Sequence, residues 1–507
     1  MSVDTNNAAF QDALNLIQYT RQSVFLTGKA GTGKSTFLRY VCEHTKKKYV
    51  VLAPTGIAAI NAGGSTMHSF FKLPFYPLLP DDPNLSLQRG RIHEFFKYTK
   101  PHRKLLEQIE LVIIDEISMV RADIIDAIDR ILRVYSHNLR EPFGGKQLLL
   151  VGDVFQLEPV VKNDEREILN RFYPTPYFFS ARVFGQIDLV SIELQKVYRQ
   201  TDPVFVGVLD HIRTNTAGAA DLQLLNTRYG SQIEESEADM YITLATRRDT
   251  VDSINEKKLA ELPGESITFE GVIEGDFPES SLPTSQELVL KPGAQIIFIK
   301  NDFDRRWVNG TIGVIAGIDE EEETIYVITD DGKECDVKRD SWRNIRYRYN
   351  EKTKEIEEEV LGSFTQYPIR LAWAITVHKS QGLTFSRVVI DFTGGVFAGG
   401  QAYVALSRCT SLDGIQLKKP INRADIFVRP EIVNFAGRFN NRQAIDKALK
   451  QAQADVQYAA AARAFNKGDM EECLEQFFRA IHSRYDIEKP VPRRLIRRKL
   501  GIINTLK

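Results

Sequence analysis

A glycine-rich run near the start of the chain has the spacing needed to hold phosphate. Residues 28–36 read G-K-A-G-T-G-K-S-T and follow an apolar run at 24–26, which indicates a buried strand, a turn and a helix. Glycines let successive backbone N–H groups face phosphate oxygens, and the helix start adds the positive end of its dipole. In this pattern Lys34 reaches the β- and γ-phosphates of a nucleotide, and the Ser35 hydroxyl holds Mg²⁺. The predicted nucleotide contacts in the run are Gly28, Ala30, Gly31, Thr32, Gly33, Lys34, Ser35 and Thr36.

Two acids follow a second apolar run, as a phosphate loop requires. Residues 111–114 are Leu-Val-Ile-Ile, and Asp115 and Glu116 come directly after them. Asp115 can hold the Mg²⁺ shell, and Glu116 can orient or deprotonate an attacking water. The pair is therefore predicted to lie beside the phosphate loop at the carboxyl end of a neighbouring strand.

Amide and guanidinium groups further along complete the predicted nucleotide site. Gln156 follows the apolar run at 148–151 and could bond the γ-phosphate and report hydrolysis to a polymer site. Arg199 and Arg408 lie in a second α/β region without a phosphate loop, from which a guanidinium can stabilise charge across a cleft. Gln11, on an amphipathic helical pattern, could read an adenine edge, although a solvated helix residue is an equally good interpretation.

Apolar runs with chemistry at their carboxyl ends predict a doubly wound, RecA-like α/β sheet. We expect a first domain at 1–185, interrupted at about 71–103 by a proline-rich insertion, and a second domain at 186–291 and 366–432. Short β-rich runs and turn signals predict a small β-barrel at 292–365. After 433 the chain is helical and then basic, with one unit similar to a helical repeat, and we expect a chain ending near 433 to keep its activity.

Composition describes an ordinary globular chain of several domains. It has 507 residues, 43% hydrophobic and 26% charged, with a net charge of −1, which leaves room only for a local basic groove. No apolar run approaches the ~20 residues that span a bilayer, and the polar start predicts no signal peptide. Four scattered cysteines predict neither a zinc site nor a disulfide framework, which suits the cytoplasm.

Taken in order, the motifs resemble those of superfamily-one DNA helicases, specifically the Pif family and its RecD-like relatives. The matching stretches cover about 28–411 and read GKAGTGKST, APTGIAA, STMHSF, DEISM, GDVFQLEPV, VYRQ, TVHKSQGLTF and VALSRC. The chain departs from many eukaryotic members at residues 121–122, where Arg-Ala replaces Asp-Gly. The resemblance implies two RecA-like domains, a wedge insertion in the first and a Src-homology-3-like barrel in the second.

The resemblance also implies ATP-driven 5′-to-3′ movement on single-stranded DNA in repair, recombination and replication. The expected partners are single-stranded DNA, 5′-tailed or structured duplex DNA, and a protein bound by the helical C-terminal extension; no membrane partner is expected, and the chain is expected near a bacterial nucleoid. Gly382 would approach the γ-phosphate. The residues expected to face DNA are Pro54, Thr55, Gly56, Thr66, His68, Arg247, Thr376, His378, Lys379 and Ser380, with Trp307 and Asn309 on a barrel loop that also carries Phe303.

Two other functions fit parts of the pattern. An ATP-gated nucleic-acid clamp would bind without separating strands, and only a strand-displacement assay distinguishes it from a helicase. A P-loop kinase or GTPase-like switch would share the phosphate loop. The order Asp-Glu, Gly-Asp-x-x-Gln and Ser-Arg argues against that switch, as does the lack of a guanine-reading N-K-x-D tetrad.

Overall fold

Short apolar strands alternate with helices through the first 194 residues and form one parallel sheet. The computed structural model describes residues 4–86, 91–200, 202–230 and 240–483, with five single positions beyond them, and orders this sheet β3-β2-β4-β5-β1-β6. The strands are β1 (Val24–Gly28), β2 (Tyr49–Ala53), β3 (Ser65–Thr66), β4 (Leu111–Ile114), β5 (Gln147–Val151) and β6 (Val190–Leu194). The helices are α1 (Ala8–Tyr19), α2 (Lys34–His44), α3 (Gly56–Ala62), α4 (Met67–Phe71), α5 (Arg91–Phe96), α6 (Lys100–Gln108), α7 (Ala122–Tyr135) and α8 (Asn163–Leu169).

Both faces of this sheet are covered, because successive side chains of a strand point to opposite faces. Phe25 and Val112 pack with the buried residues of α7 on one face. Leu26 and Ile113 pack with α1 and α2 on the other. The arrangement confirms the predicted doubly wound α/β class and brings the carboxyl ends of β1, β4 and β5 to one edge.

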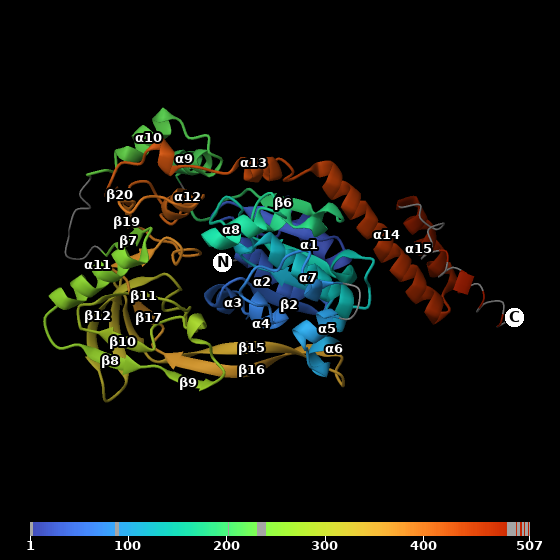
Figure 1. Ribbon diagram of the computed structural model, residues 1–507, viewed down its shortest axis with the longest axis horizontal. Coiled ribbons are helices and arrows are strands. Elements are labelled where there is room, and N and C mark those ends of the chain that lie inside the picture. Colours follow the sequence, from blue (N-terminus) through green and yellow to red (C-terminus); the bar gives the residue numbers. More distant parts are fainter. Residues whose placement is uncertain are drawn as a thin grey trace.

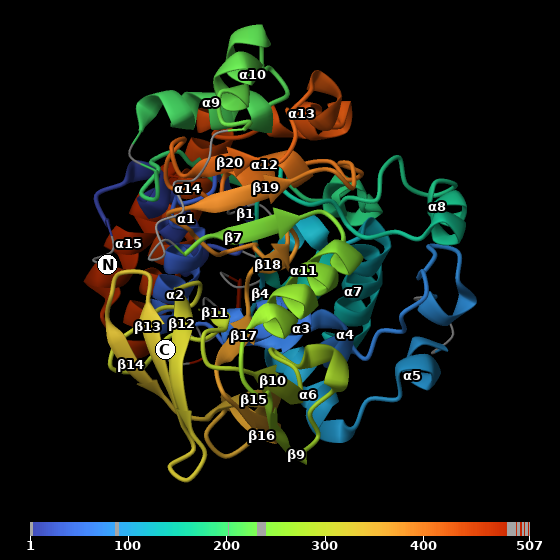
Figure 2. The same ribbon diagram turned by 90° about the vertical axis from the view of Figure 1, so that its left-hand side faces the viewer.

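A second, smaller α/β domain repeats the design. Its sheet has the order β18-β7-β19-β20 and is parallel throughout (Figure 2). Its elements are α9 (Pro203–Arg213), α10 (Ala219–Asn226), β7 (Ile242–Ala245), α11 (Arg248–Glu261), β18 (Ala374–Thr376), β19 (Val388–Asp391), α12 (Gln401–Leu406) and β20 (Ile415–Leu417). Its core is a separate apolar cluster from those of the first sheet.

Between α11 and β18 the chain forms a β-rich insertion, here defined as residues 267–371. One sheet has the order β14-β13-β12-β11-β17, the pair β10-β8 shares its core, and β15-β16-β9 make a third sheet. The bounds are β8 (Ile267–Glu270), β9 (Val272–Gly275), β10 (Glu287–Leu290), β11 (Gln295–Phe298), β12 (Ile312–Asp319), β13 (Thr324–Thr329), β14 (Glu334–Val337), β15 (Asp340–Asn350), β16 (Glu355–Gln366) and β17 (Ile369–Leu371).

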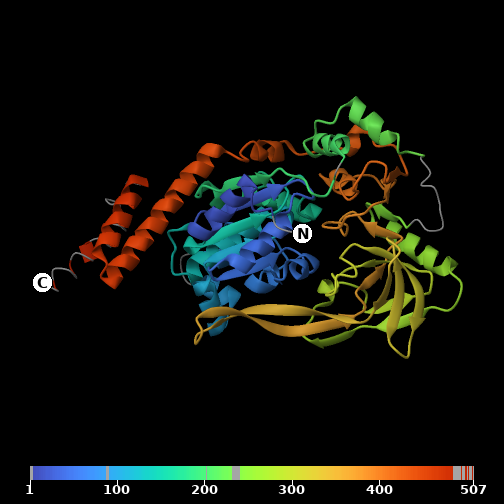
Figure 3. The same ribbon diagram turned by 180° about the vertical axis from the view of Figure 1, so that it is seen from behind.

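The hairpin β15–β16 reaches from this insertion along the underside of the first domain (Figures 1 and 3). Near its tip Tyr347 is buried in the first-domain core, where its hydroxyl accepts a hydrogen bond from the backbone N–H of Val51 at 3.3 Å. The insertion is thus held by the second domain through its chain ends and by the first domain through this hairpin.

The helical end consists of α13 (Pro430–Ala436), α14 (Arg442–Lys467) and α15 (Met470–Ser483). Phe435 on α13 stacks on Phe179 at 4.3 Å between ring centroids, inside the first-domain core. Ile445 and Ala448 on α14 pack against the α1 and α2 side of the sheet. The rest of α14 projects beyond the domain with α15 beside it (Figure 1). The predicted basic tail lies largely outside the described residues.

Three predicted boundaries need correction. The first domain does not end at 185, because β6 is hydrogen-bonded to β1 in the same sheet. The β-insertion extends beyond 292–365 on both sides, because β8 and β10 share its core and β17 pairs with β11. The helical end is not separable at 433, since Phe435 and Ile445 are part of the first domain.

Within the described part of the chain, no helix combines the length and apolarity needed to cross a bilayer.

We predict that Phe435→Ala lowers the free energy of unfolding by about 3–5 kcal/mol, because it empties an aromatic site in the first-domain core. Phe478→Ala on α15 is the matched control, since that ring is exposed and its loss should change stability by no more than about 0.5 kcal/mol. Urea unfolding of both variants makes the comparison. A similarly small loss in both would show that α13 does not belong to the domain.

Candidate functional site

The glycine-rich run forms the turn between β1 and α2 that its spacing predicts. Gly28 and Gly31 have φ values of 155° and 79°, which favour glycine. A side chain at Gly28 would also come within 2.7 Å of the carbonyl oxygen of Leu194. The ammonium of Lys34 donates hydrogen bonds to the carbonyl oxygens of Gly28 at 2.7 Å and Lys29 at 3.1 Å. The loop therefore has the shape and charge of a phosphate cradle.

Asp115 and Glu116 stand at the carboxyl end of β4, facing this loop. Glu116 has a φ of 50°, and its N–H donates to Asp115 Oδ1 at 2.9 Å. Burial raises the pKa of both carboxyls, and the neighbouring Asp115 contributes to raising that of Glu116 to about 7. Burial conversely lowers the pKa of Lys34, whose charge favours both carboxylates. A carboxyl that titrates near neutrality is suited to accept a proton from water.

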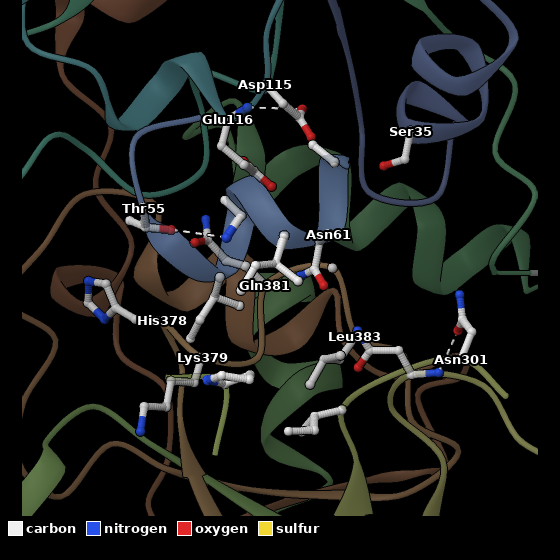
Figure 4. A pocket seen from close by; sticks show the side chains of 18 of the residues that line it. Ser35, Thr55, Asn61, Asp115, Glu116, Asn301, His378, Lys379, Gln381 and Leu383 are labelled. Carbon is white, nitrogen blue, oxygen red and sulfur yellow. Dashed lines mark hydrogen bonds between the residues drawn. The ribbon is translucent and has the colours of Figure 1, made fainter. Parts of the chain in front are cut away.

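Oxygen donors suited to Mg²⁺ come from two elements. Ser35 is the exposed second residue of α2, and Asp115 follows β4; Figure 4 shows both side chains lining one cleft. Hydroxyl and carboxylate oxygens are ligands that Mg²⁺ accepts together with phosphate and water. These residues therefore fit the ion that the loop pattern predicts.

The two predicted arginines lie together where the domains meet. Arg199 donates from its guanidinium to the carbonyl oxygens of Gly382 at 3.4 Å and Ser407 at 3.5 Å. Arg408 is 1% exposed and donates to the Val404 carbonyl oxygen at 2.9 Å. Burial, followed by the charge of Arg199, lowers the pKa of Arg408 to about 9. Two desolvated guanidinium groups facing the phosphate loop create a demand for negative charge there.

Two further side chains bind the domains together at this point, and sequence reasoning missed both. Arg213, at the end of α9, pairs with Asp153 at 3.1 Å and with Glu193 at 2.9 Å. Tyr403 on α12 accepts a hydrogen bond from the N–H of Ala30 in the phosphate loop at 3.1 Å. Tyr403 could have been noticed as a hydroxyl five positions before Arg408 in an apolar run. Nothing in the sequence singles out Arg213.

Gln156 and Gln11 are the remaining residues predicted to contact the nucleotide, and both form local hydrogen bonds. Gln156 is buried just after β5, with its N–H donating to the Asp153 carbonyl oxygen at 2.9 Å. Gln11 donates from its side-chain amide to the Thr5 carbonyl oxygen at 2.8 Å, which ties the N-terminal segment to α1. Their contacts with a nucleotide stay predictions.

One cleft of about 480 Å³ joins the nucleotide residues to those expected to face DNA. Asp115 and Glu116 lie at one end in Figure 4, and His378 and Lys379 lie at the other. The cleft has walls from both α/β domains and from the β-insertion. The predicted residues that line it are Ser35, Thr55, Asp115, Glu116, Asn309, His378, Lys379 and Gly382.

Several predicted DNA contacts serve the local backbone. The hydroxyl of Thr55 accepts from the Ala58 N–H at 3.2 Å and caps α3, and Thr66 caps α4 by accepting from the Ser69 N–H at 3.2 Å. Thr376 accepts from the Lys379 N–H at 3.2 Å. These bonds explain why hydroxyl residues stand at these turns. The contacts of the three threonines with DNA stay predictions.

The other first-domain candidates surround the start of α3. Pro54 and Gly56 flank Thr55, and the Cα of Gly56 lies so close to Ser281 of the insertion that a side chain would come within 2.6 Å of its hydroxyl oxygen. His68 stacks on Phe75 at 5.1 Å between ring centroids, and burial lowers its pKa.

Two predicted DNA contacts are wrong. Trp307 is only 6% exposed and stacks on Phe298 at 4.4 Å between ring centroids, so it fills the core of the insertion. Ser380 is fully buried, and its hydroxyl donates to the Val377 carbonyl oxygen at 2.7 Å. The sequence pattern could not show which side of its turn each residue faces. Arg247, in contrast, is exposed and donates to the Gly394 carbonyl oxygen at 3.2 Å.

Comparison with known proteins places the chain in a family. A family model described as PIF1-like helicase matches residues 4–207. A protein named ATP-dependent DNA helicase Pif1, from Bdellovibrio bacteriovorus, is 31% identical over 439 residues, which cover 84% of this chain and 90% of that protein.

Two solved structures of a Pif1 from Bacteroides show the same fold. One is a complex with ADP-AlF4, with 41% identity and a TM-score of 0.78 over 86% of this chain and 97% of that one. The other is bound to single-stranded DNA, with 41% identity and a TM-score of 0.62 over 88% of this chain and 99% of that one. With its motifs, fold and relatives in agreement, this chain belongs to the PIF1-like helicase family.

Proposed function

We propose that this chain is an ATP-dependent DNA helicase that moves 5′-to-3′ on single-stranded DNA and unwinds duplex or structured DNA during genome maintenance. The observation that carries the proposal is the single cleft that joins Asp115 and Glu116 to His378 and Lys379. The relative from Bdellovibrio is named an ATP-dependent DNA helicase, and the Bacteroides relative has been solved with single-stranded DNA.

At the nucleotide end, each predicted residue has a role that its position supports. Lys34 neutralises phosphate charge, and Glu116 positions or deprotonates the attacking water. Arg199 and Arg408 approach from the boundary with the second domain and stabilise the charge that develops in the transition state. Mg²⁺, held by Ser35 and Asp115, would supply further neutralisation of the phosphates.

Coupling between the two ends has a short physical path. Residues 378–382 run from His378 and Lys379 at the DNA end to Gly382, whose carbonyl oxygen accepts from Arg199. The helix α12 carries Tyr403, bonded to the phosphate loop, and leads directly to Arg408. A change at the nucleotide therefore moves groups that also shape the DNA end.

We also propose a protein partner and a cellular location for this chain. We infer a protein partner for the projecting helices, because Leu474 and Phe478 are exposed on one side of α15. We also infer work beside DNA in a bacterial cytoplasm, as fits a relative of the Bdellovibrio protein.

The function is tested by its dependence on DNA and on tail polarity. We expect single-stranded DNA to raise the ATP turnover rate, and strand displacement to require a 5′ tail. Paired initial rates of turnover and displacement on 5′-tailed and 3′-tailed duplexes provide the measurement. Stimulated turnover with no displacement would support an ATP-gated clamp, and preference for a 3′ tail would contradict the polarity.

We predict that Lys34→Ala abolishes ATP hydrolysis and leaves affinity for single-stranded DNA largely intact, because Lys34 faces the phosphate loop and not the DNA end of the cleft. The exposed Lys46→Ala on the following loop is a control that should hydrolyse ATP normally. ATPase assays and fluorescence anisotropy with labelled DNA measure both properties. Near-normal hydrolysis by Lys34→Ala would refute the site.

We predict that Arg408→Ala lowers kcat for ATP by about 10³, because a guanidinium at the γ-phosphate acts on the transition state. The measurement is steady-state kinetics with saturating DNA, and a circular-dichroism melt shows whether the buried site still folds. A rise in KM with an unchanged kcat would reduce Arg408 to a substrate-binding residue.

On the barrel loop of the β-insertion, the aromatic side chain that can stack on DNA is Phe303, which is 98% exposed, and not the buried Trp307. We predict that Phe303→Ala lowers unwinding more than ATP hydrolysis, because a lost base stack of about 1–3 kcal/mol weakens grip without touching phosphate. The ratio of strand displacement to ATP turnover is the measured quantity. The exposed Val308→Ala on the same loop serves as the control. An unchanged ratio in Phe303→Ala would remove the loop from the DNA path.

A further inference from the structure

An arginine that no motif contains lies on the wall that the β-insertion contributes to the cleft. Arg370 is the middle residue of β17, which pairs with β11 so that Arg370 is opposite Ile297. Its neighbour Ile369 is buried in the core of the insertion. Because side chains alternate along a strand, Arg370 points the other way, toward the cleft that it lines with Ile297.

The charge of Arg370 is half-buried and uncompensated. Among the residues that the structure describes, none forms an ion pair or a hydrogen bond with its guanidinium, although the fork carries five N–H donors. Burial alone lowers its pKa to about 10, since no acid acts on it. A desolvated charge without a partner destabilises a fold, and an anion bound beside it would offset that cost.

The nearest charged groups strengthen the demand for an anion. Lys379 lines the same cleft, and burial together with the charges of Arg370 and Arg248 lowers its pKa, opposed by Asp252. Gln381, two residues further on, has a buried side-chain N–H₂ without a hydrogen-bond partner among the described residues. Two cations and an unused donor thus gather on one side of the cleft.

The acidic residues nearby indicate which of two clefts an anion beside Arg370 occupies. Arg370 and Lys379 also border a second cleft of about 800 Å³ beside α11. Its other cations are engaged, since Arg248 pairs with Asp252 at 3.4 Å and Lys291 donates to the Leu262 carbonyl oxygen at 3.0 Å. Glu256 and Glu287 line the same cleft and oppose the binding of a polyanion. The first cleft carries carboxylates only at its nucleotide end, and uncharged polar groups of Asn301 and Asn309 lie along the insertion. An anion next to Arg370 therefore belongs in the first cleft.

We propose that Arg370 binds a backbone phosphate of the single-stranded DNA, on the same side of the cleft as Lys379. The inference rests on the proposed function and adds to it, because it makes the β-insertion a charged part of the grip as well as a stacking surface. Arginine suits this position because its planar fork donates two parallel hydrogen bonds to a phosphate and loses little freedom when anchored on a strand.

The test compares Arg370→Gln and Arg370→Lys with Arg346→Gln in the full chain. Arg346 is a matched control, since it is an exposed arginine of the same insertion paired with Glu359 at 2.8 Å. Binding of labelled oligo-dT and of a mixed-sequence strand is measured by anisotropy over a range of salt concentrations. Arg370→Gln should bind both strands about tenfold more weakly, and the slope of log affinity against log salt should fall by about 0.7. Arg370→Lys should recover part of the affinity, and Arg346→Gln should behave as the unaltered chain.

A stability measurement separates binding from a structural role. Without DNA, Arg370→Gln should melt at the same temperature as the unaltered chain or higher, because an unpaired buried charge is removed. The inference would be overturned if Arg370→Gln kept the affinity and salt slope of the unaltered chain. It would also be overturned if Arg370→Gln melted at a lower temperature, because weaker binding would then follow from lost stability. Either result would leave the proposed function standing. Failure of the unaltered chain to bind single-stranded DNA would overturn both.

Discussion

The molecule depends on a concentration of buried charge where its two α/β domains meet. Lys34, Asp115 and Glu116 lie together in the first domain, and the buried Arg408 of the second domain acts on Glu116 across the boundary. Buried charges are stable only when opposite groups are held close, so the ionic contacts also determine how the domains lie together. A nucleotide that adds negative charge and Mg²⁺ to this group changes the balance on both sides, which makes it an effective trigger of domain movement.

The remaining architecture connects that trigger to the DNA end. Parallel sheets place the phosphate loop and the acid pair at one edge, and the segment 376–383 of the second domain crosses from there to Lys379. The β-insertion closes the third wall and is held by the first domain through the hairpin that buries Tyr347. Movement of one domain relative to the other would therefore change the width of the cleft between them.

The sequence predicted what is local and missed what is assembled from distant segments. Lys34 and Glu116 could be assigned because a strand, a turn and a helix follow one another within a few residues. Arg213 meets Asp153 across 60 positions, and no pattern along the chain reports that pairing. The composition of its loop predicts a DNA contact for Trp307, but composition cannot show that the ring packs on Phe298. The segment after 433 carries no motif and so is predicted to be separable, whereas packing makes its first helices part of the core.

We propose above all that nucleotide binding and DNA binding are linked through the cleft that joins their sites. The most direct test measures the affinity for single-stranded DNA with and without a non-hydrolysable ATP analogue, and the affinity for the analogue with and without DNA. Linkage requires the two ratios to be equal, and we predict that both differ from one by at least about fivefold. Two ratios equal to one would mean that the sites bind independently, which would contradict the account.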